Sequence, residues 1–197
     1  EAMAAAPGVR VFLHPDAPGP KYSLKEWGAK WVGMSDPVRR AVDSPRIVWT
    51  AGPTEVCPGV WVTGPIPRKT DFEDVGGPFY IDPDATRPGM LWDDQAVYFE
   101  CEHGLAIVLG CAHAGVVNTL QYVIQLTQRR QVYAVIGGMH LLRADKRRME
   151  KTIDAIRSFD VQKLIPVHCT GDAATAELRH AFKEKCLAGG SGAVLDL

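Results

Sequence analysis

Three histidines stand just beyond three apolar runs, and this pattern constrains the fold more than any other feature. His113, His140 and His168 follow β-rich runs at residues 105–109, 132–138 and 164–167. His113 and His140 are 27 residues apart, and His140 and His168 are 28 apart, which suits one strand and one helix each. In an open α/β sheet, the carboxyl ends of neighbouring parallel strands meet at one crevice. The sequence therefore predicts three imidazoles at one edge, as a metal-ligand set would require.

The segments between and after these runs have helical periodicity. Apolar residues recur on one face over 116–127, over 149–159 and, more weakly, over 178–185. Asp145 and Asp172 occupy expected N-cap positions. A terminal strand is predicted over 192–197. The chain opens with Glu1-Ala-Met-Ala-Ala-Ala6, a strong helix former without a capping residue before it, which predicts the end of a helix that begins upstream.

Residues 64–91 are rich in proline, glycine and acidic side chains and lack apolar periodicity. A segment this long without secondary structure is usually either functional or mobile. We expect a loop insertion near the site. It could cover the histidine crevice as a lid, or it could be an excursion over the surface.

Composition excludes several function classes. The 197 residues carry 22 basic and 23 acidic side chains, so nothing in the charge favours nucleic acid or a membrane surface. No apolar run reaches the roughly 18 residues of a membrane-spanning helix. The five cysteines form no Cys-x-x-Cys pair, which favours reduced thiols in a cytoplasmic protein. We expect one domain that binds a small molecule.

The residues around the histidines resemble a known family. Three segments carry the resemblance, Gly110-Cys-Ala-His-Ala-Gly-Val-Val-Asn-Thr-Leu120, Ile136-Gly-Gly-Met-His-Leu141 and Pro166-Val-His-Cys-Thr-Gly171, with support from Gly64-Pro-Ile-Pro-Arg68 and Asp93-Asp-Gln-Ala96. They look like the metallo-β-lactamase superfamily, in its branch of dihydropterin ribofuranosyl-aminobenzene phosphate synthase-like metal-dependent hydrolases. The resemblance implies an α/β (α+β) fold, an αββα sandwich with a metal site at one edge. It also implies that His113 and His168 are metal ligands.

Two departures from the family pattern qualify this expectation. The family's main metal motif, His-x-His-x-Asp-His, is absent from the sequence. The carboxylate that bridges two metals in many relatives would fall near Gly137-Gly138-Met139-His140, where no acid stands. The expected architecture is therefore one metallo-β-lactamase-like domain over 1–197 that lacks its N-terminal portion, with half of the usual site.

The expected chemistry is metal-dependent hydrolysis. Neutral imidazole binds zinc, iron or nickel, and such a centre lowers the pKa of bound water to about 7. The hydroxide would attack an ester, lactone or phosphoester. We expect His113, His168 and His140 as ligands, and together they could hold one tetrahedral zinc. His140 could instead contact the substrate or another ligand. Zinc is the foremost expectation, with iron, manganese or nickel as alternatives, and the metal could be absent from this chain.

Several neighbours of these histidines are candidates for supporting roles. Cys111 and Cys169 stand beside expected ligands and could be small buried hydrophobes, thiolate ligands or redox-sensitive thiols. Asp94 could turn the chain or orient a histidine, and Thr170 could support the site or touch substrate. His14 is expected at the surface.

Two functions remain open from the sequence. The first is a metal-dependent hydrolase whose activity is impaired in this truncated form. The second is a non-catalytic homodimeric domain with structural histidines, because the missing N-terminal portion would leave one side of the sandwich open and apolar.

Overall fold

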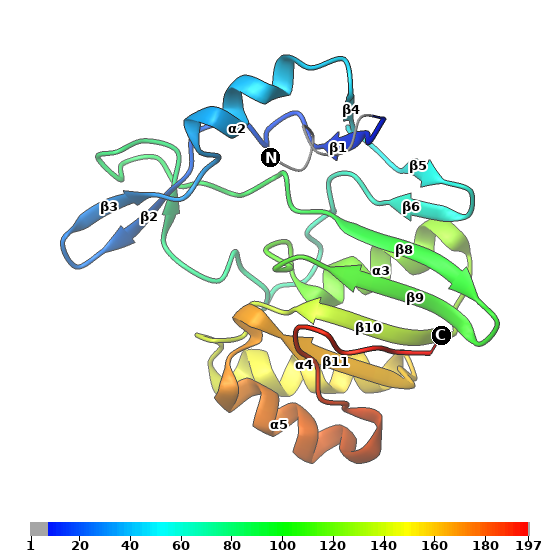
Figure 1. Ribbon diagram of the computed structural model, residues 1–197. Coiled ribbons are helices and arrows are strands. Elements are labelled where there is room, and N and C mark those ends of the chain that lie inside the picture. Colours follow the sequence, from blue (N-terminus) through cyan, green and yellow to red (C-terminus); the bar gives the residue numbers. More distant parts are fainter. Residues whose placement is uncertain (1–7, 197) are drawn as a thin grey trace.

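The main sheet has six strands in the order β11-β10-β9-β8-β6-β5 (Figure 1). The computed structural model describes residues 8–196. The strands are β5 (Thr54–Cys57), β6 (Val60–Val62), β8 (Ala96–Cys101), β9 (Gly104–Leu109), β10 (Val132–Gly138) and β11 (Lys163–Val167). The strands β9, β10 and β11 run parallel, whereas β5, β6, β8 and β9 pair antiparallel. The parallel part coincides with the three apolar runs of the sequence.

Three helices cover one face of this sheet. They are α3 (Val116–Thr127), α4 (Lys146–Ser158) and α5 (Asp172–Phe182), and Figure 1 shows α3 and α4 behind the strands. Tyr98, Ile107, Val135 and Leu164 form a row across neighbouring strands and are buried in the hydrophobic core beneath the helices. Burial of apolar side chains such as these is the dominant favourable contribution to folding. The carboxylate of Asp145 caps α4 as predicted, but Asp172 is the first residue of α5, and Gly171 holds its N-cap position.

The opposite face of the sheet is also apolar but less completely covered. Its row is Val62, Val97, Val108, Ile136 and Ile165. The three middle residues of this row are half-buried. The C-terminal segment after Cys186 runs past β11 on this side, where Gly189 lies against Ile165 and Val167. The terminal strand predicted over 192–197 is absent from the described part of this segment, where residues 191–192 form a turn.

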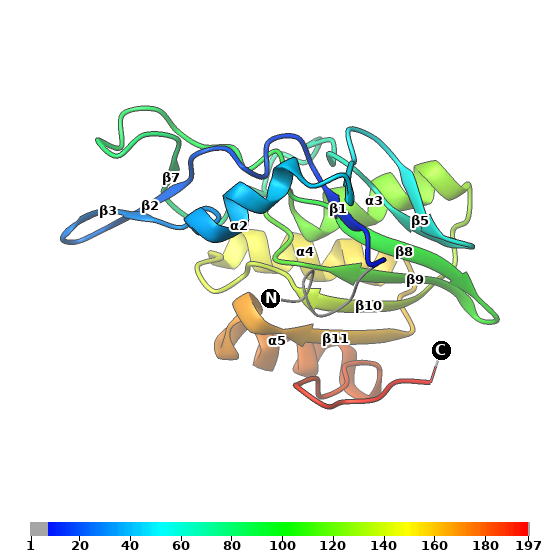
Figure 2. The same ribbon diagram turned by 45° about the horizontal axis from the view of Figure 1, so that its top comes forward.

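Smaller elements stand at the edges. β1 (Val11–Leu13) and β4 (Ile47–Trp49) pair in parallel, while β2 (Tyr22–Lys25), β3 (Gly28–Trp31) and β7 (Phe79–Tyr80) form a three-stranded sheet. The β2–β3 hairpin extends away from the main sheet (Figure 2). The remaining elements are α2 (Asp36–Arg40) and three short 3-10 turns, η1 (Ala41–Asp43), η2 (His168–Thr170) and η3 (Lys183–Lys185). No helix within residues 8–196 is long and apolar enough to cross a membrane. The helix expected over residues 1–6 lies outside the described residues.

Candidate metal centre

The loops that follow β9, β10 and β11 carry the three predicted histidines at one edge of the sheet. Each loop contains a non-glycine residue in the left-handed region, with φ of 55° at Ala112, 46° at His140 and 53° at His168. Such conformations cost about 1–3 kcal/mol each and concentrate at functional sites. These turns lie at the edge that carries the histidines, in agreement with a candidate site there.

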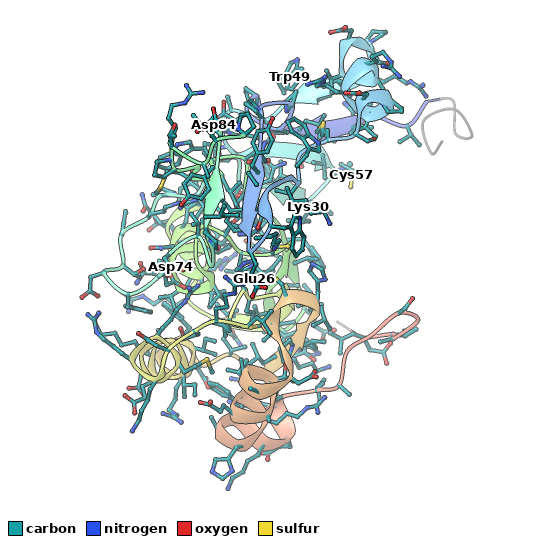
Figure 3. The ribbon with its side chains drawn as sticks, turned by 90° about the vertical axis from the view of Figure 1, so that its left-hand side faces the viewer. Glu26, Lys30, Trp49, Cys57, Asp74 and Asp84 are labelled. Atoms are coloured by element: carbon teal, nitrogen blue, oxygen red, sulfur yellow. The ribbon has the colours of Figure 1, made fainter. Side chains whose placement is uncertain are left out.

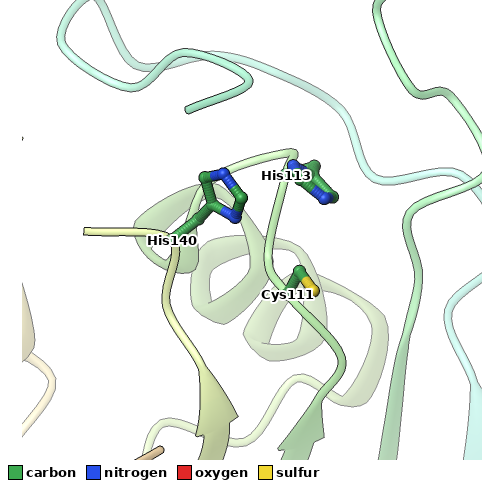
Figure 4. A group of neighbouring side chains, drawn as sticks. All are labelled: Cys111, His113 and His140. Atoms are coloured by element: carbon green, nitrogen blue, oxygen red, sulfur yellow. The ribbon is translucent and has the colours of Figure 1, made fainter. Parts of the chain in front are cut away.

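The structure divides the candidate ligands into two groups. The ligand atoms of Cys111, His113 and His140 all lie within 4.8 Å of one another, and so do those of Cys111, His168 and Cys169. The rings of His113 and His140 are 4.2 Å apart between centroids (Figure 4). Among the described residues, the three histidines form no single group of this kind. The single three-histidine zinc site considered from the sequence is therefore replaced by two groups that share Cys111.

The surroundings of His113 favour the tautomer that a metal ligand needs. Its Nδ1 lies 2.8 Å from the carbonyl oxygen of Val75. A carbonyl can only accept, so Nδ1 must carry the proton, and Nε2 keeps a free lone pair. Burial lowers the pKa of His113, and the nearby His140 lowers it further, which favours the neutral ring. A backbone carbonyl that fixes the tautomer in this way is the usual support of a ligating histidine.

His140 has an unsatisfied nitrogen in the same place. Its Nδ1 is buried and has no hydrogen-bond partner in the described structure. Gly76 packs directly onto the ring, and a Cβ at that position would stand 1.7 Å from Cδ2. Buried polar atoms are almost always paired, and an orphan requires an explanation. An imidazole nitrogen without a hydrogen-bond partner, beside a second imidazole and a thiol, is a suitable ligand for a divalent transition metal.

The second group is built on the turn after β11. Cys169 Sγ lies 3.5 Å from the carbonyl oxygen of Cys111, and the two thiols contact each other. This contact lowers the pKa of Cys169 and raises that of Cys111. His168 is exposed, whereas the cysteines are half-buried. The group therefore faces solvent on the histidine side.

Asp94 and Thr170 form hydrogen bonds with backbone groups rather than with the imidazoles. Asp94 Oδ2 accepts the N–H of Ala114 at 2.8 Å, and burial raises the pKa of this carboxyl. Thr170 is fully buried, and its hydroxyl accepts the N–H of Met139 at 3.1 Å and donates to Val167 at 2.8 Å. Asp94 thereby fixes the loop of His113, and Thr170 ties the end of β10 to the end of β11.

Glu73, Val75 and Gly76, within the segment 64–91, contact the site or the start of α3, and the sequence did not single them out individually. Val75 and Gly76 touch the two imidazoles, and Glu73 accepts the N–H groups of Val117 and Asn118, each at 2.9 Å. The part of the segment 64–91 that holds Val75 and Gly76 thus lies against the two imidazoles. The only sequence signal was its cluster of acids and glycines. His14, expected at the surface, is instead buried, and its Nδ1 accepts the N–H of Asp16 at 3.1 Å.

A cleft of about 360 Å³ opens beside His113. Its lining combines the main sheet edge with the small sheet, through residues that include Lys21, Val32, Phe79, Asp93, Cys111 and His113. Phe79 packs edge-on against the ring of His113, with centroids 5.1 Å apart. A small molecule in this cleft would therefore reach both the thiol of Cys111 and the imidazole of His113.

Comparisons with known proteins agree with this architecture. The structure superposes on that of Tm1679, described as a metal-dependent hydrolase of the beta-lactamase superfamily, with a TM-score of 0.84 and 24% identity over 99% of this chain and 73% of that one. In sequence, the chain is 31% identical over 168 residues to the 7,8-dihydropterin-6-methyl-4-(beta-D-ribofuranosyl)-aminobenzene-5'-phosphate synthase of Methanocaldococcus jannaschii. An uncharacterised protein of the same organism is 25% identical over 170 residues.

These matches cover 83% and 86% of this chain but only 52% and 61% of the two Methanocaldococcus proteins. The chain thus spans little more than half the length of the curated relatives it matches. No family model matches the chain. The chain has the fold of the metallo-β-lactamase superfamily and is similar in sequence to the dihydropterin ribofuranosyl-aminobenzene phosphate synthase, as its three strand-end motifs predicted.

Proposed function

We propose that this chain belongs to a metal-dependent hydrolase of small ester, lactone or phosphoester substrates. One observation carries the proposal: ligand atoms of His113, His140 and Cys111 lie within 4.8 Å of one another, and His113 and Cys111 line an open cleft. A cleft with convergent polar groups and perturbed pKa values is the usual form of an active site. The superfamily fold raises this expectation by analogy.

Each residue has a definite task in this proposal. His113, His140 and Cys111 would hold the metal, which when bound lowers the pKa of a water molecule and polarises a substrate oxygen. The carbonyl of Val75 keeps the proton of His113 on Nδ1, so that Nε2 stays available. Gly76 packs on the ring of His140 and shields it from water. Asp94 anchors the loop that carries His113, which keeps its ring facing the cleft.

The metal and the substrate are proposed at the level of chemical class. Two imidazoles and a thiol favour zinc, with iron, manganese or nickel as alternatives. The name of the Methanocaldococcus relative contains a 5'-phosphate, which favours a phosphorylated small molecule among the three ester classes. The same name says synthase, so the reaction could be a transfer rather than a hydrolysis. None of the five cysteines forms a disulfide, which supports a cytoplasmic location.

Metal content and esterase activity test the proposal together. The reduced chain should take up about one equivalent of zinc at this group. It should also hydrolyse a p-nitrophenyl phosphate diester or p-nitrophenyl acetate. His113→Ala and His140→Ala should lose most of both properties. His103→Ala is the matched control, because His103 is exposed in the turn between β8 and β9. Less than a tenth of an equivalent of any transition metal after reconstitution would overturn the proposal.

A second candidate function is that of a non-catalytic homodimer. The observation that favours it is the apolar row across the open face of the sheet, in which Val97, Val108 and Ile136 are half-buried. A second copy could cover this face, and the histidines would then be structural. Light scattering distinguishes the two cases, because a monomer at micromolar concentration would rule out the dimer.

A further inference from the structure

We propose that a second pocket, beside the cleft at His113, binds a flat aromatic ring that carries an amino group. This ring pocket has a volume of about 360 Å³ and lies between residues 15–21 and residues 80–93. Lys21, Leu91 and Asp93 line both the ring pocket and the cleft, so one small molecule can occupy both. The inference rests on the proposed function and deepens it, because it assigns the part of the substrate that lies away from the metal.

The walls of the ring pocket are large apolar side chains that remain open to solvent. Trp92 is 50% exposed, Met90 41% and Ile81 38%. Tyr80 and three prolines add to the same lining. Large apolar side chains that gather at an exposed place mark an interaction site. Because aromatic faces stack on other rings, these walls favour a flat aromatic ligand, and the volume suits a single or fused ring.

The ammonium of Lys21 joins the two sides of the ring pocket. It donates to the carbonyl oxygens of Asp16 and Ala17 at 2.8 and 3.1 Å, on the side formed by residues 15–21. On the opposite side it pairs with the carboxylate of Asp93 at 3.3 Å. The pocket is therefore held in shape without a ligand, which lowers the entropy lost on binding.

A second cation holds the aromatic wall. The guanidinium of Arg68 lies 5.0 Å from the ring centre of Trp92 and donates to the carbonyl oxygens of Met90 and Leu91. Arg68 itself is not part of the lining of the ring pocket. The indole of Trp92 is thus supported by a cation–π contact, although half of its surface is exposed.

The charges of the lining favour an amino group on the ring over a carboxylate. The ionisable groups among the charged lining residues are the carboxylates of Asp16 and Asp93 and the ammonium of Lys21. An ammonium has three N–H donors, and Lys21 directs them to two carbonyls and to Asp93. The exposed carboxylate of Asp16 has no partner within residues 8–196 and can accept from an aromatic amine. A ring carboxylate would meet like charge instead.

Binding of 6-aminoquinoline to the metal-free chain is the first test, because it requires neither a metal nor hydrolysis. The protein is dialysed against a chelator, and affinity is measured by isothermal titration calorimetry. We expect a dissociation constant below about 1 mM, in line with the size of the probe. Quinoline-6-carboxylate has the same ring system with a negative charge and should bind at least about fivefold more weakly. Absence of 6-aminoquinoline binding up to about 5 mM would overturn the proposal.

Substitution of Trp92 tests where the probe binds. Trp92→Ala should weaken binding of 6-aminoquinoline at least about fivefold, whereas Trp92→Phe keeps a ring and should stay within about twofold of wild type. Trp27→Ala is the matched control, because Trp27 is 78% exposed in the turn between β2 and β3 and lines neither cavity. Asp16→Asn should reduce the preference for the amine over the carboxylate. Equal affinities in Trp92→Ala and Trp27→Ala would refute the assignment of the probe to this pocket.

His113→Ala separates the ring pocket from the proposed function. His113 lines the cleft but not the ring pocket, so this variant should lose hydrolysis and bind 6-aminoquinoline as tightly as wild type. A wild-type chain that takes up no metal but binds the probe through Trp92 would refute the hydrolase and support the ring pocket. A chain that takes up metal and hydrolyses esters, but does not bind the probe, would refute the ring pocket alone.

Discussion

Gly76 illustrates how one missing side chain shapes the candidate metal centre. Gly76→Ala would place a methyl group 1.7 Å from Cδ2 of His140, so the imidazole must move away from His113. Metal affinity should fall about 10–100-fold, the usual effect of disturbing the support of a ligand. Competition titration with a chromophoric chelator measures this change.

Gly59→Ala is the matched control for this substitution. Gly59 has φ of 79° against 80° for Gly76, but a Cβ there meets no atom within 4 Å. Both variants therefore carry the same backbone strain, and only Gly76→Ala disturbs the imidazole. Equal metal affinity in the two variants would show that Gly76 does not position His140.

Sequence reasoning located the histidines but not their grouping. The strand-end rule places His113, His140 and His168 at one edge because it depends only on strand order. Which of them share a ligand group depends on the left-handed turns at Ala112, His140 and His168, and no local pattern marks such turns at residues other than glycine. The contact between Val75 and His113 joins residues 38 positions apart, across a loop without periodicity. For that reason the loop's role stayed open.

The helix α3 begins with a cap that comes from a distant loop. Its own N-cap residue is Gly115, which has no side chain, and the carboxylate of Glu73 accepts the N–H groups of Val117 and Asn118 instead. Glu73→Ala would leave these two donors unpaired and should lower the free energy of unfolding by about 1–3 kcal/mol. Urea denaturation measures the loss. Glu102→Ala, at an exposed turn, is the control, and a difference of less than about 0.5 kcal/mol between the two variants would contradict the capping role.

The same loop is tied to α4 through ion pairs that depend on pH. Asp71 accepts from Lys151 at 2.9 Å and from Arg147 at 2.8 Å, and the hydrogen bond from Lys151 lowers the pKa of Asp71. A carboxyl with a lowered pKa in the folded state stabilises above its unfolded pKa of about 3.9, and this contribution disappears as the pH falls through the folded value. Asp71→Asn should therefore lower the urea midpoint at pH 7, and the difference from wild type should shrink between about pH 5 and pH 3.

Asp84→Asn provides the comparison for Asp71. Asp84 is an exposed residue of the same loop and makes no ion pair with any described residue (Figure 3). Its substitution should leave the midpoint unchanged at both pH values. Because Asp71 is itself exposed, added salt should also weaken its contribution at pH 7. A pH-independent difference between Asp71→Asn and wild type would mean that the charge of Asp71 is not what holds the loop.

At the scale of the whole molecule, the parallel half of the sheet followed directly from the sequence. Continuous apolar strands alternating with amphipathic helices allow one arrangement, in which helices cover the buried face. The edges were less predictable, because β1 and β4 pair only with each other and the C-terminal segment folds back without a strand. Short segments such as these take their conformation from tertiary contacts rather than from their own periodicity.

The two faces of the sheet should differ in how much they contribute to stability. Val135 is fully buried under the helices, and Val108 is half-buried on the open face one strand away. At about 1 μM protein, Val135→Ala should lower the free energy of unfolding by about 2 kcal/mol, because apolar burial is lost and a cavity remains. Val108→Ala should lower it by less than half of that amount. Urea denaturation of both variants tests this comparison.

Protein concentration then decides whether a second copy covers the open face. A partner that binds only the folded state makes stability rise with concentration. If the chain dimerises through this face, the free energy of unfolding lost in Val108→Ala should grow as the protein concentration rises from about 1 to 100 μM. The loss in Val135→Ala should stay constant over the same range. A cost of Val108→Ala that does not change with concentration would exclude the dimer and leave the hydrolase proposal as the one that the candidate metal centre supports.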